Sequence, residues 1–334
     1  MAALAGLNPE PSSATKGARQ RAWVLTHEMR SELATAEMTP SELVKLGALI
    51  ERTRGSGDVT IGLIDGPVAA DHPDLAGAPI RELAGNGKAT CQRADSVACM
   101  HGTFVAGILS GRSRASAPSI CPDCTLLVRP IFGETHARPE SLPSATPDEL
   151  AAAIMESVAA GARILNLSVA LAQPSPRGLE SLEAALDSTV RRGVLVVVAA
   201  GNQGTLGSSA LTRHPWVIPV IAVDHHGRPL PESNLGSSIG RRGLGAPGEG
   251  VTSLGSGGKP LTLGGTSVAA PFVTGAIALL WSLFPGAPAP LMKRCITQAS
   301  HQRRTSVVPP MLNAEAAFQI MTSSYSKGHQ YGAS

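Results

Sequence analysis

Aromatic and charged residues are both scarce in this chain of 334 residues. Phe, Trp and Tyr make up 3% of the sequence and charged residues 16%, whereas hydrophobic residues make up 43%. So apolar a chain with so little charge is not a disordered one. The 36 glycines have no three-residue period, which excludes a collagen-like chain. The core must therefore be built from Ala, Val, Leu and Ile, with glycines at tight turns and close backbone contacts.

Long apolar runs and a strong charge imbalance are also missing. No apolar run reaches the roughly 18 to 20 residues that cross a bilayer, so we expect no contact with a membrane. The net charge of +3 is small and dispersed, which argues against a nucleic-acid partner. Residues 1–20 lack the basic start and apolar block of a secretory signal, so we expect a cytoplasmic protein. The oligomeric state stays open.

Cysteine is rare, with five residues, four of which form two pairs. Cys91 and Cys99 are separated by seven residues, and Cys121 and Cys124 by two. Reduced thiols, one or two disulfides and a structural zinc site all fit this pattern. We prefer reduced thiols because cytoplasmic proteins seldom keep disulfides. Cys295 lies in an apolar helical stretch and is expected in the core. We predict no metal and no cofactor.

Apolar strands alternate with helical segments along most of the sequence. This order is typical of a parallel sheet with helices on both faces, so we predict a doubly wound, mostly parallel α/β fold. The expected strands are Val59–Ile64, Thr125–Phe132, Ile164–Val169, Val194–Ala199 and Val217–Val223. The expected helices are His101–Ser110, Thr146–Ala160, Leu179–Arg192, Thr266–Phe284, Ala289–Ala299 and Asn313–Met321, with two more within residues 24–53.

Composition and pattern together predict three regions. Residues 1–56 form an N-terminal extension, disordered at first and then helical, with a helix start at Thr39-Pro40-Ser41-Glu42. Residues 57–322 form the catalytic domain, and residues 323–334 form a polar tail.

Four polar residues stand at strand ends or near helix starts, where sites form in such folds. They are Asp65 after an apolar strand, His101 in His-Gly-Thr, Asn202 in Ala-Gly-Asn and Ser267 in Gly-Thr-Ser. A serine hydroxyl is a weak nucleophile that needs a base, for which a histidine is suited. An aspartate can orient that histidine, and an amide can donate a hydrogen bond to a developing oxyanion. The four residues therefore favour acyl transfer.

These segments, in this chain order, resemble the subtilisin-like serine proteases, or subtilases, over residues 59–319. The resemblance implies Ser267 as nucleophile, His101 as general base and Asp65 as orienting acid. It implies Asn202 as oxyanion donor, beside the Ser267 backbone N–H. It further implies that the peptide substrate is bound as an added strand by the following residues: Ser168, Val169 and Ala170, with Gly201.

A narrower resemblance comes from a departure after the aspartate. Many subtilases have a small hydroxyl residue there, whereas this chain has Gly66-Pro67-Val68, which is similar to the proteases of cyanobactin (patellamide-type) maturation. The segments 129–132 and 224–230 are similar as well. In that group one type cuts a precursor peptide, and another, with a helical insertion between Asp and His, macrocyclises it.

Spacing favours the cutting type in this chain. Only 36 positions separate Asp65 from His101, which leaves no room for a two-helix lid. We therefore predict a serine endopeptidase that hydrolyses its acyl-enzyme. A macrocyclase of the same fold and an inactive peptide-binding scaffold stay as alternatives.

Overall fold

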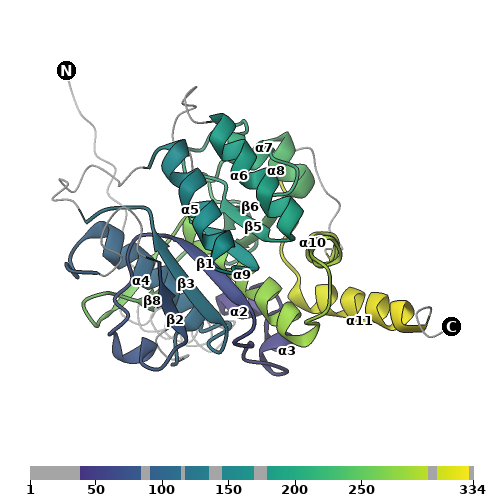
Figure 1. Cartoon of the computed structure of the whole chain (residues 1–334), viewed down its shortest axis with the longest axis horizontal. Coiled ribbons are helices and arrows are strands. Elements are labelled where there is room, and N and C mark those ends of the chain that lie inside the picture. Colours follow the sequence, from purple (N-terminus) through teal and green to yellow (C-terminus); the bar gives the residue numbers. More distant parts are fainter. Residues whose placement is uncertain are drawn as a thin grey trace, which may run out of the picture. The chain divides into compact units, whose positions relative to one another are not determined.

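The computed structural model describes residues 38–83, 91–113, 117–134, 145–168, 179–299 and 307–330, the last five by their main chain only. Its centre is a seven-stranded sheet in the order β2-β3-β1-β4-β5-β6-β7, and every pairing in it is parallel (Figure 1). The prediction of a doubly wound α/β fold is confirmed. The strands are β1 Thr60–Asp65, β2 Ile80–Glu82, β3 Thr125–Pro130, β4 Ile164–Leu167, β5 Leu195–Ala199, β6 Ile218–Val223 and β7 Leu244–Pro247.

A short antiparallel hairpin, β8 Val251–Leu254 with β9 Pro260–Leu263, lies outside the main sheet. The helical elements surround the sheet (Figure 1). They are α2 Pro40–Leu43, α3 Gly47–Ile50, the 3₁₀ turn η1 Pro73–Leu75, α4 Val97–Ser110, α5 Pro147–Ala159, α6 Leu179–Arg192, α7 Ala210–Arg213, α8 Ser237–Arg242, α9 Thr266–Leu283, α10 Ala289–Gln298 and α11 Ala314–Gln330.

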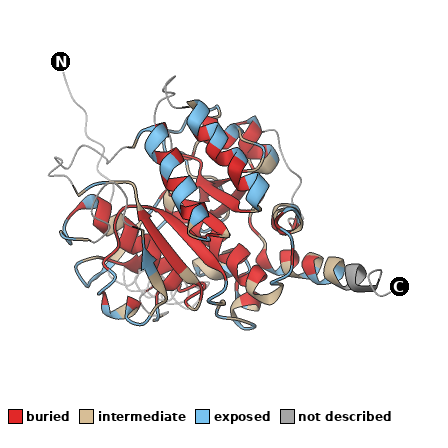
Figure 2. Cartoon of the chain, viewed as in Figure 1, coloured by how far each residue is buried: buried red, intermediate tan, exposed pale blue. Residues whose placement is uncertain are grey.

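The sheet separates two hydrophobic cores, which explains why its strands are apolar throughout. On one face, Leu63 and Val197 pack in a core with α4 and α9. On the other face, Ile64 and Val198 pack in a core with α5 and α6. The central strands are accordingly buried along their whole length (Figure 2). Burial on both faces is the rule for parallel sheets.

β1, the first strand along the chain, lies in the interior of the sheet, between β3 and β4, and this placement creates the site. β3 and β2 extend the sheet on one side of β1, and β4 to β7 extend it on the other. The strand order therefore reverses between β1 and β4, and ligands bind outside the carboxyl ends of the strands at such a point. Asp65 is the last residue of β1, and Ser168 directly follows β4.

Several boundaries differ from those predicted. α4 begins four residues earlier than expected, because the Ser96 side chain caps it by accepting the Cys99 N–H. α11 continues to Gln330, into the stretch expected to be a polar tail. Near the N-terminus, the predicted helix start is confirmed: Thr39 and Glu42 form a capping box. Most of the predicted N-terminal extension, residues 1–37, lies outside the described part.

One helix meets the length and composition of a membrane span, contrary to our reading of the sequence. α9 has 18 residues and a mean hydropathy of 1.6. The sequence predicts this helix but not its resemblance to a membrane span, because Thr, Ser, Gly and Pro interrupt its apolar residues. Within the fold 83% of this helix is buried, and its side chains pack in the core on one face of the sheet. α9 is therefore accounted for as the central core helix.

Candidate active site

Asp65, His101 and Ser267 meet at the carboxyl end of β1, although 36 and 166 positions separate them along the chain. His101 Nδ1 lies 2.7 Å from Asp65 Oδ1, and His101 Nε2 lies 2.9 Å from Ser267 Oγ. Both distances are those of hydrogen bonds. With the proton of the neutral ring on Nδ1, that N–H donates to the carboxylate and Nε2 accepts from the serine hydroxyl. The structure thus brings together the three residues predicted to share one chemistry.

The Asp65 carboxylate is fully buried and its contacts are concentrated on one oxygen. Oδ1 accepts the Gly66 N–H at 2.6 Å as well as the His101 contact. Oδ2 has no hydrogen-bond partner among the described residues. The chain departs here from the subtilases that have a hydroxyl residue next to the aspartate. A side chain would not fit at Gly66, because its Cβ would lie 1.9 Å from the Ala98 carbonyl oxygen.

His101 stands on the second turn of α4 rather than at the helix start that the sequence suggested. About a quarter of its side chain, 26%, is exposed. Burial lowers the pKa of His101, but the negative charge of Asp65 and the hydrogen bond to it outweigh burial. The pKa therefore lies above its ordinary value of 6.5. Asp65 stabilises the imidazolium that forms when His101 accepts a proton.

Ser267 is the second residue of α9, and a glycine turn places it there. Gly265 precedes the helix with φ +110°, a conformation that favours glycine. A Cβ at Gly265 would also lie 2.8 Å from Asn202 Nδ2, so only glycine lets the two segments approach. The first backbone N–H groups of a helix have no partner inside it, and the helix dipole adds positive potential. This end of α9 is therefore suited to a developing negative charge.

Asn202 is held by Thr266, a residue for which the sequence motifs predict no role. Asn202 Oδ1 accepts the Thr266 backbone N–H and its hydroxyl, each at 2.9 Å. The Thr266 oxygen in turn accepts the Gly201 N–H at 3.1 Å. With Oδ1 bound in this way, the Asn202 amide has its NH₂ group left to donate. Thr266 directly precedes Ser267, a position that could have drawn attention to it.

Gly201 was predicted to contact substrate, but both of its backbone groups are used inside the protein. Its N–H donates to Thr266 and its carbonyl accepts the Asn234 N–H. Gly201 has φ +107°. In this structure it therefore supports the turn that carries Asn202.

Ser168, which the resemblance assigns to substrate binding, lies beside the nucleophile. Its hydroxyl donates to the Ser267 carbonyl oxygen at 3.4 Å and accepts from Asn166 Nδ2 at 2.8 Å. Asn166 in β4 is fully buried, and its Oδ1 accepts the Thr274 hydroxyl of α9. The polar Asn166 inside an apolar strand was the available signal for this network. Two further predicted substrate contacts, Val169 and Ala170, lie outside the described residues.

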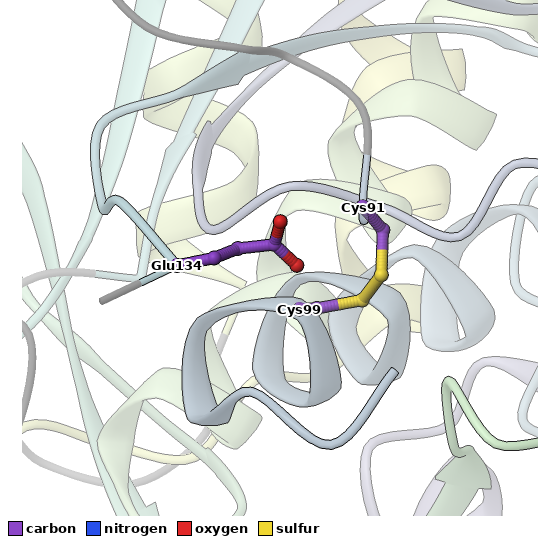
Figure 3. Close-up of side chains that lie close together, drawn as sticks. All are labelled: Cys91, Cys99 and Glu134. Atoms are coloured by element: carbon purple, nitrogen blue, oxygen red, sulfur yellow. A yellow bond between two sulfur atoms is a disulfide. The ribbon is translucent and has the colours of Figure 1, made fainter. Parts of the chain in front are cut away.

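The cysteines differ from our preferred prediction at one pair. Cys91 and Cys99 form a disulfide, so the expectation of reduced thiols was wrong there. Cys121, Cys124 and Cys295 are free and buried. Figure 3 shows the Glu134 side chain directed toward the disulfide. The two sulfur atoms and a carboxylate oxygen of Glu134 lie within 4.8 Å of one another. Because the two sulfur atoms are bonded to each other, they offer no thiolate to a metal in this state.

The family model of the subtilases matches residues 56–319. The chain belongs to the subtilase family. It is 27% identical to subtilisin DY of Bacillus licheniformis over 284 residues, which cover 83% of this chain and 97% of that protein. The protein is thus a serine protease of the subtilisin-like type, and the family predicted from its four motifs is confirmed.

Solved structures narrow the likeness within the subtilases. The patellamide maturation protease PatA has 32% sequence identity and a TM-score of 0.66, over 80% of this chain and 98% of that one. The PatG macrocyclase in complex with peptide has a TM-score of 0.72 over 84% and 96%, but only 20% identity. At this level of identity, the likeness to PatG shows the fold alone. The predicted resemblance to the patellamide-type subtilases is confirmed.

Proposed function

We propose that this subtilase is an endopeptidase whose Ser267 attacks the peptide carbonyl with His101 as general base and Asp65 as orienting acid. The observation that carries the proposal is the pair of contacts on His101, 2.7 Å to Asp65 and 2.9 Å to Ser267. A base within hydrogen-bond reach of the nucleophile, and oriented by a third group, defines this chemistry.

The proton moves through His101 in both halves of the reaction. As Ser267 Oγ forms its bond to the carbonyl carbon, His101 Nε2 takes the hydroxyl proton. That proton then passes to the leaving amine when the peptide C–N bond breaks. A water molecule attacks the acyl-enzyme with His101 again as base, and the serine is restored when the acid product leaves. Asp65 keeps the ring oriented throughout.

We propose that the oxyanion of the tetrahedral intermediate lies between the Asn202 amide and the Ser267 backbone N–H. Thr266 supports this role, because it holds Asn202 Oδ1 with two hydrogen bonds. A donor fixed before the reaction costs no reorganisation when the charge develops. Peptide binding along Ser168, Val169 and Ala170 as an added strand is part of the same proposal.

We propose a ribosomal precursor peptide as the substrate and hydrolysis as the outcome. The likeness to PatA, a maturation protease, supports the substrate class. In residues 66–83 and 91–96, the described part between β1 and α4, the structure has a 3₁₀ turn and strand β2 but no α-helix that could shield an acyl-enzyme from water. Macrocyclisation is the alternative within this fold.

Mass spectrometry of the products distinguishes these outcomes. Incubation with a precursor peptide should give linear fragments, each heavier by one water than the residues it contains. A cyclic product, lighter by one water than the linear fragment, would establish the macrocyclase instead. Binding without any product would establish the peptide-binding scaffold, and the Ser267→Ala variant is the matched negative control.

We also propose that the enzyme works in the cytoplasm, where Cys121, Cys124 and Cys295 stay reduced. The Cys91–Cys99 disulfide argues against this proposal, since cytoplasmic thiol systems reduce most disulfides. If the enzyme works in the cytoplasm, Cys91 and Cys99 should be found as thiols in cells. Alkylation of thiols in intact cells before lysis measures the state of each cysteine. Recovery of the chain outside the cytoplasm, with Cys91 and Cys99 protected from alkylation by their disulfide, would contradict the proposal.

A further inference from the structure

Glu134, four residues beyond the end of β3, has a carboxylate that joins two segments of the protein. Its oxygens accept the Gln92 N–H at 2.9 Å, the Arg93 N–H at 3.0 Å and the Ser96 hydroxyl at 3.1 Å. Hydrogen bonds to an ionised carboxylate are stronger than those between neutral groups. One side chain thus fixes both the backbone and the cap of the loop that precedes α4.

The same loop leads directly to the proposed base. Ser96 caps α4, and its oxygen accepts the Cys99 N–H at 3.1 Å. The Cys91–Cys99 disulfide closes the loop onto the first turn of the helix (Figure 3). His101 follows Cys99 by two residues. Because His101 lies little more than one helical turn beyond the Ser96 cap, a displacement of the cap would also displace His101.

The segment that carries Glu134 is also bonded to Asp65, the proposed orienting acid. β3 pairs with β1, and the Ile131 N–H donates to the Asp65 carbonyl oxygen at 2.8 Å. Glu134 follows Ile131 by three residues. It therefore ties the start of the helix that carries His101 to the segment that is bonded to the backbone of Asp65. This closes a ring of contacts around the 2.7 Å hydrogen bond between the two residues.

We propose that Glu134 is a positioning residue that holds α4 so that His101 stays aligned with Asp65 and Ser267. The inference rests on the catalytic roles proposed above and goes beyond them, because Glu134 touches none of the three side chains. Catalytic groups must be held within a fraction of an ångström, and small displacements from remote changes lower the rate strongly.

The test compares Glu134→Ala with Glu134→Gln, each normalised to active sites titrated with a fluorophosphonate. Glu134→Ala should lower kcat about 10-fold or more, since a misplaced catalytic group commonly costs up to about 100-fold, with little change in KM. In a plot of its kcat/KM against pH, the acid limb should move to lower pH, because a looser contact with Asp65 raises the His101 pKa less. Glu134→Gln should recover part of the rate, because its amide oxygen can still accept the Ser96 hydroxyl.

Glu149→Ala is the matched control, because it removes a carboxylate of the same charge that caps a different helix. Glu149 bonds to Thr146 at the start of α5, and among the described residues it makes no hydrogen bond to α4. This variant should keep the wild-type kcat and pH profile.

Three results would overturn the proposal. The first is a wild-type kcat per titrated site in Glu134→Ala, even if the variant is less stable. The second is an equal pH shift in the Ala and Gln variants without loss of kcat, which would point to charge alone. The third is an equal loss in Glu149→Ala. Wild-type protein that does not react with the fluorophosphonate would instead refute the proposed function, and this inference with it.

Discussion

His101 Nε2 lies 2.9 Å from Ser267 Oγ, and the two residues come from helices on the same face of the sheet. The contact places the proton of the hydroxyl group within reach of the ring nitrogen. The same ring is bonded to Asp65 through its other nitrogen. The protonation state of His101 should therefore govern activity.

The pH dependence of kcat/KM follows from the raised pKa of His101. The ring must be neutral to accept the serine proton, so activity rises as the pH increases through this pKa. Because Asp65 places the pKa above 6.5, the midpoint of the acid limb should lie above 6.5. In Asp65→Asn the opposing effect of burial remains, and the midpoint should move down while kcat falls. A wild-type midpoint below 6.5 would contradict this account.

Asn202→Ala should act on the transition state. Loss of one oxyanion donor typically lowers kcat by about 10²- to 10³-fold, with little change in KM. Thr266→Val should give part of this loss, because the bond from its hydroxyl to Asn202 Oδ1 disappears and the backbone bond remains. Thr266→Ser keeps a hydroxyl and should be close to wild type. Steady-state kinetics check the series, and an unchanged kcat in Asn202→Ala would remove this residue from the oxyanion role.

Gly66→Ser should lower both stability and activity. Asp65 Oδ2 has no hydrogen-bond partner among the described residues, and even a serine hydroxyl that reached it would gain only about 1 kcal/mol. The serine Cβ, however, would lie 1.9 Å from the Ala98 oxygen, which forces α4 away from β1. Overpacking of this kind costs about 1–3 kcal/mol or more. Gly47→Ser is the control, since no atom lies within 4 Å of a Cβ there. Thermal unfolding compares them, and equal melting temperatures would contradict the clash.

The sequence was sufficient for the residues whose signals are local. Short motifs identified Asp65, His101, Asn202 and Ser267, and near-continuous apolar runs identified five central strands. β2, β7, β8 and β9 were missed, because they are only three or four residues long and Gly, Pro, charged or hydroxyl residues interrupt their apolar residues, which leaves no clear period.

Residues that act through tertiary contacts could not be found in this way. Nothing local distinguishes Glu134, whose three partners lie about 40 positions earlier in the chain. The start of α4 depended on the Ser96 cap rather than on the apolar run that follows it. The disulfide was equally out of reach, because spacing alone does not show that Cys91 and Cys99 approach each other.

Reduction of the Cys91–Cys99 disulfide should lower the melting temperature. The bond closes a loop with a sequence separation of 8, and loop-closure entropy for so short a loop contributes about 2 to 3 kcal/mol. A double variant, Cys91→Ser with Cys99→Ser, should show the same decrease and no further response to reductant. Calorimetry with and without reductant measures both. A double variant that still responds to reductant would assign the effect to other cysteines.

Covalent labelling by a fluorophosphonate measures directly whether His101 activates Ser267. The wild-type chain should be labelled stoichiometrically, with the adduct on Ser267 by peptide mapping. Ser267→Ala should not be labelled, and His101→Ala should be labelled far more slowly. An adduct on another residue, undiminished labelling of either variant, or an unreactive wild type under conditions that label subtilisin DY would contradict the activation of Ser267 by His101.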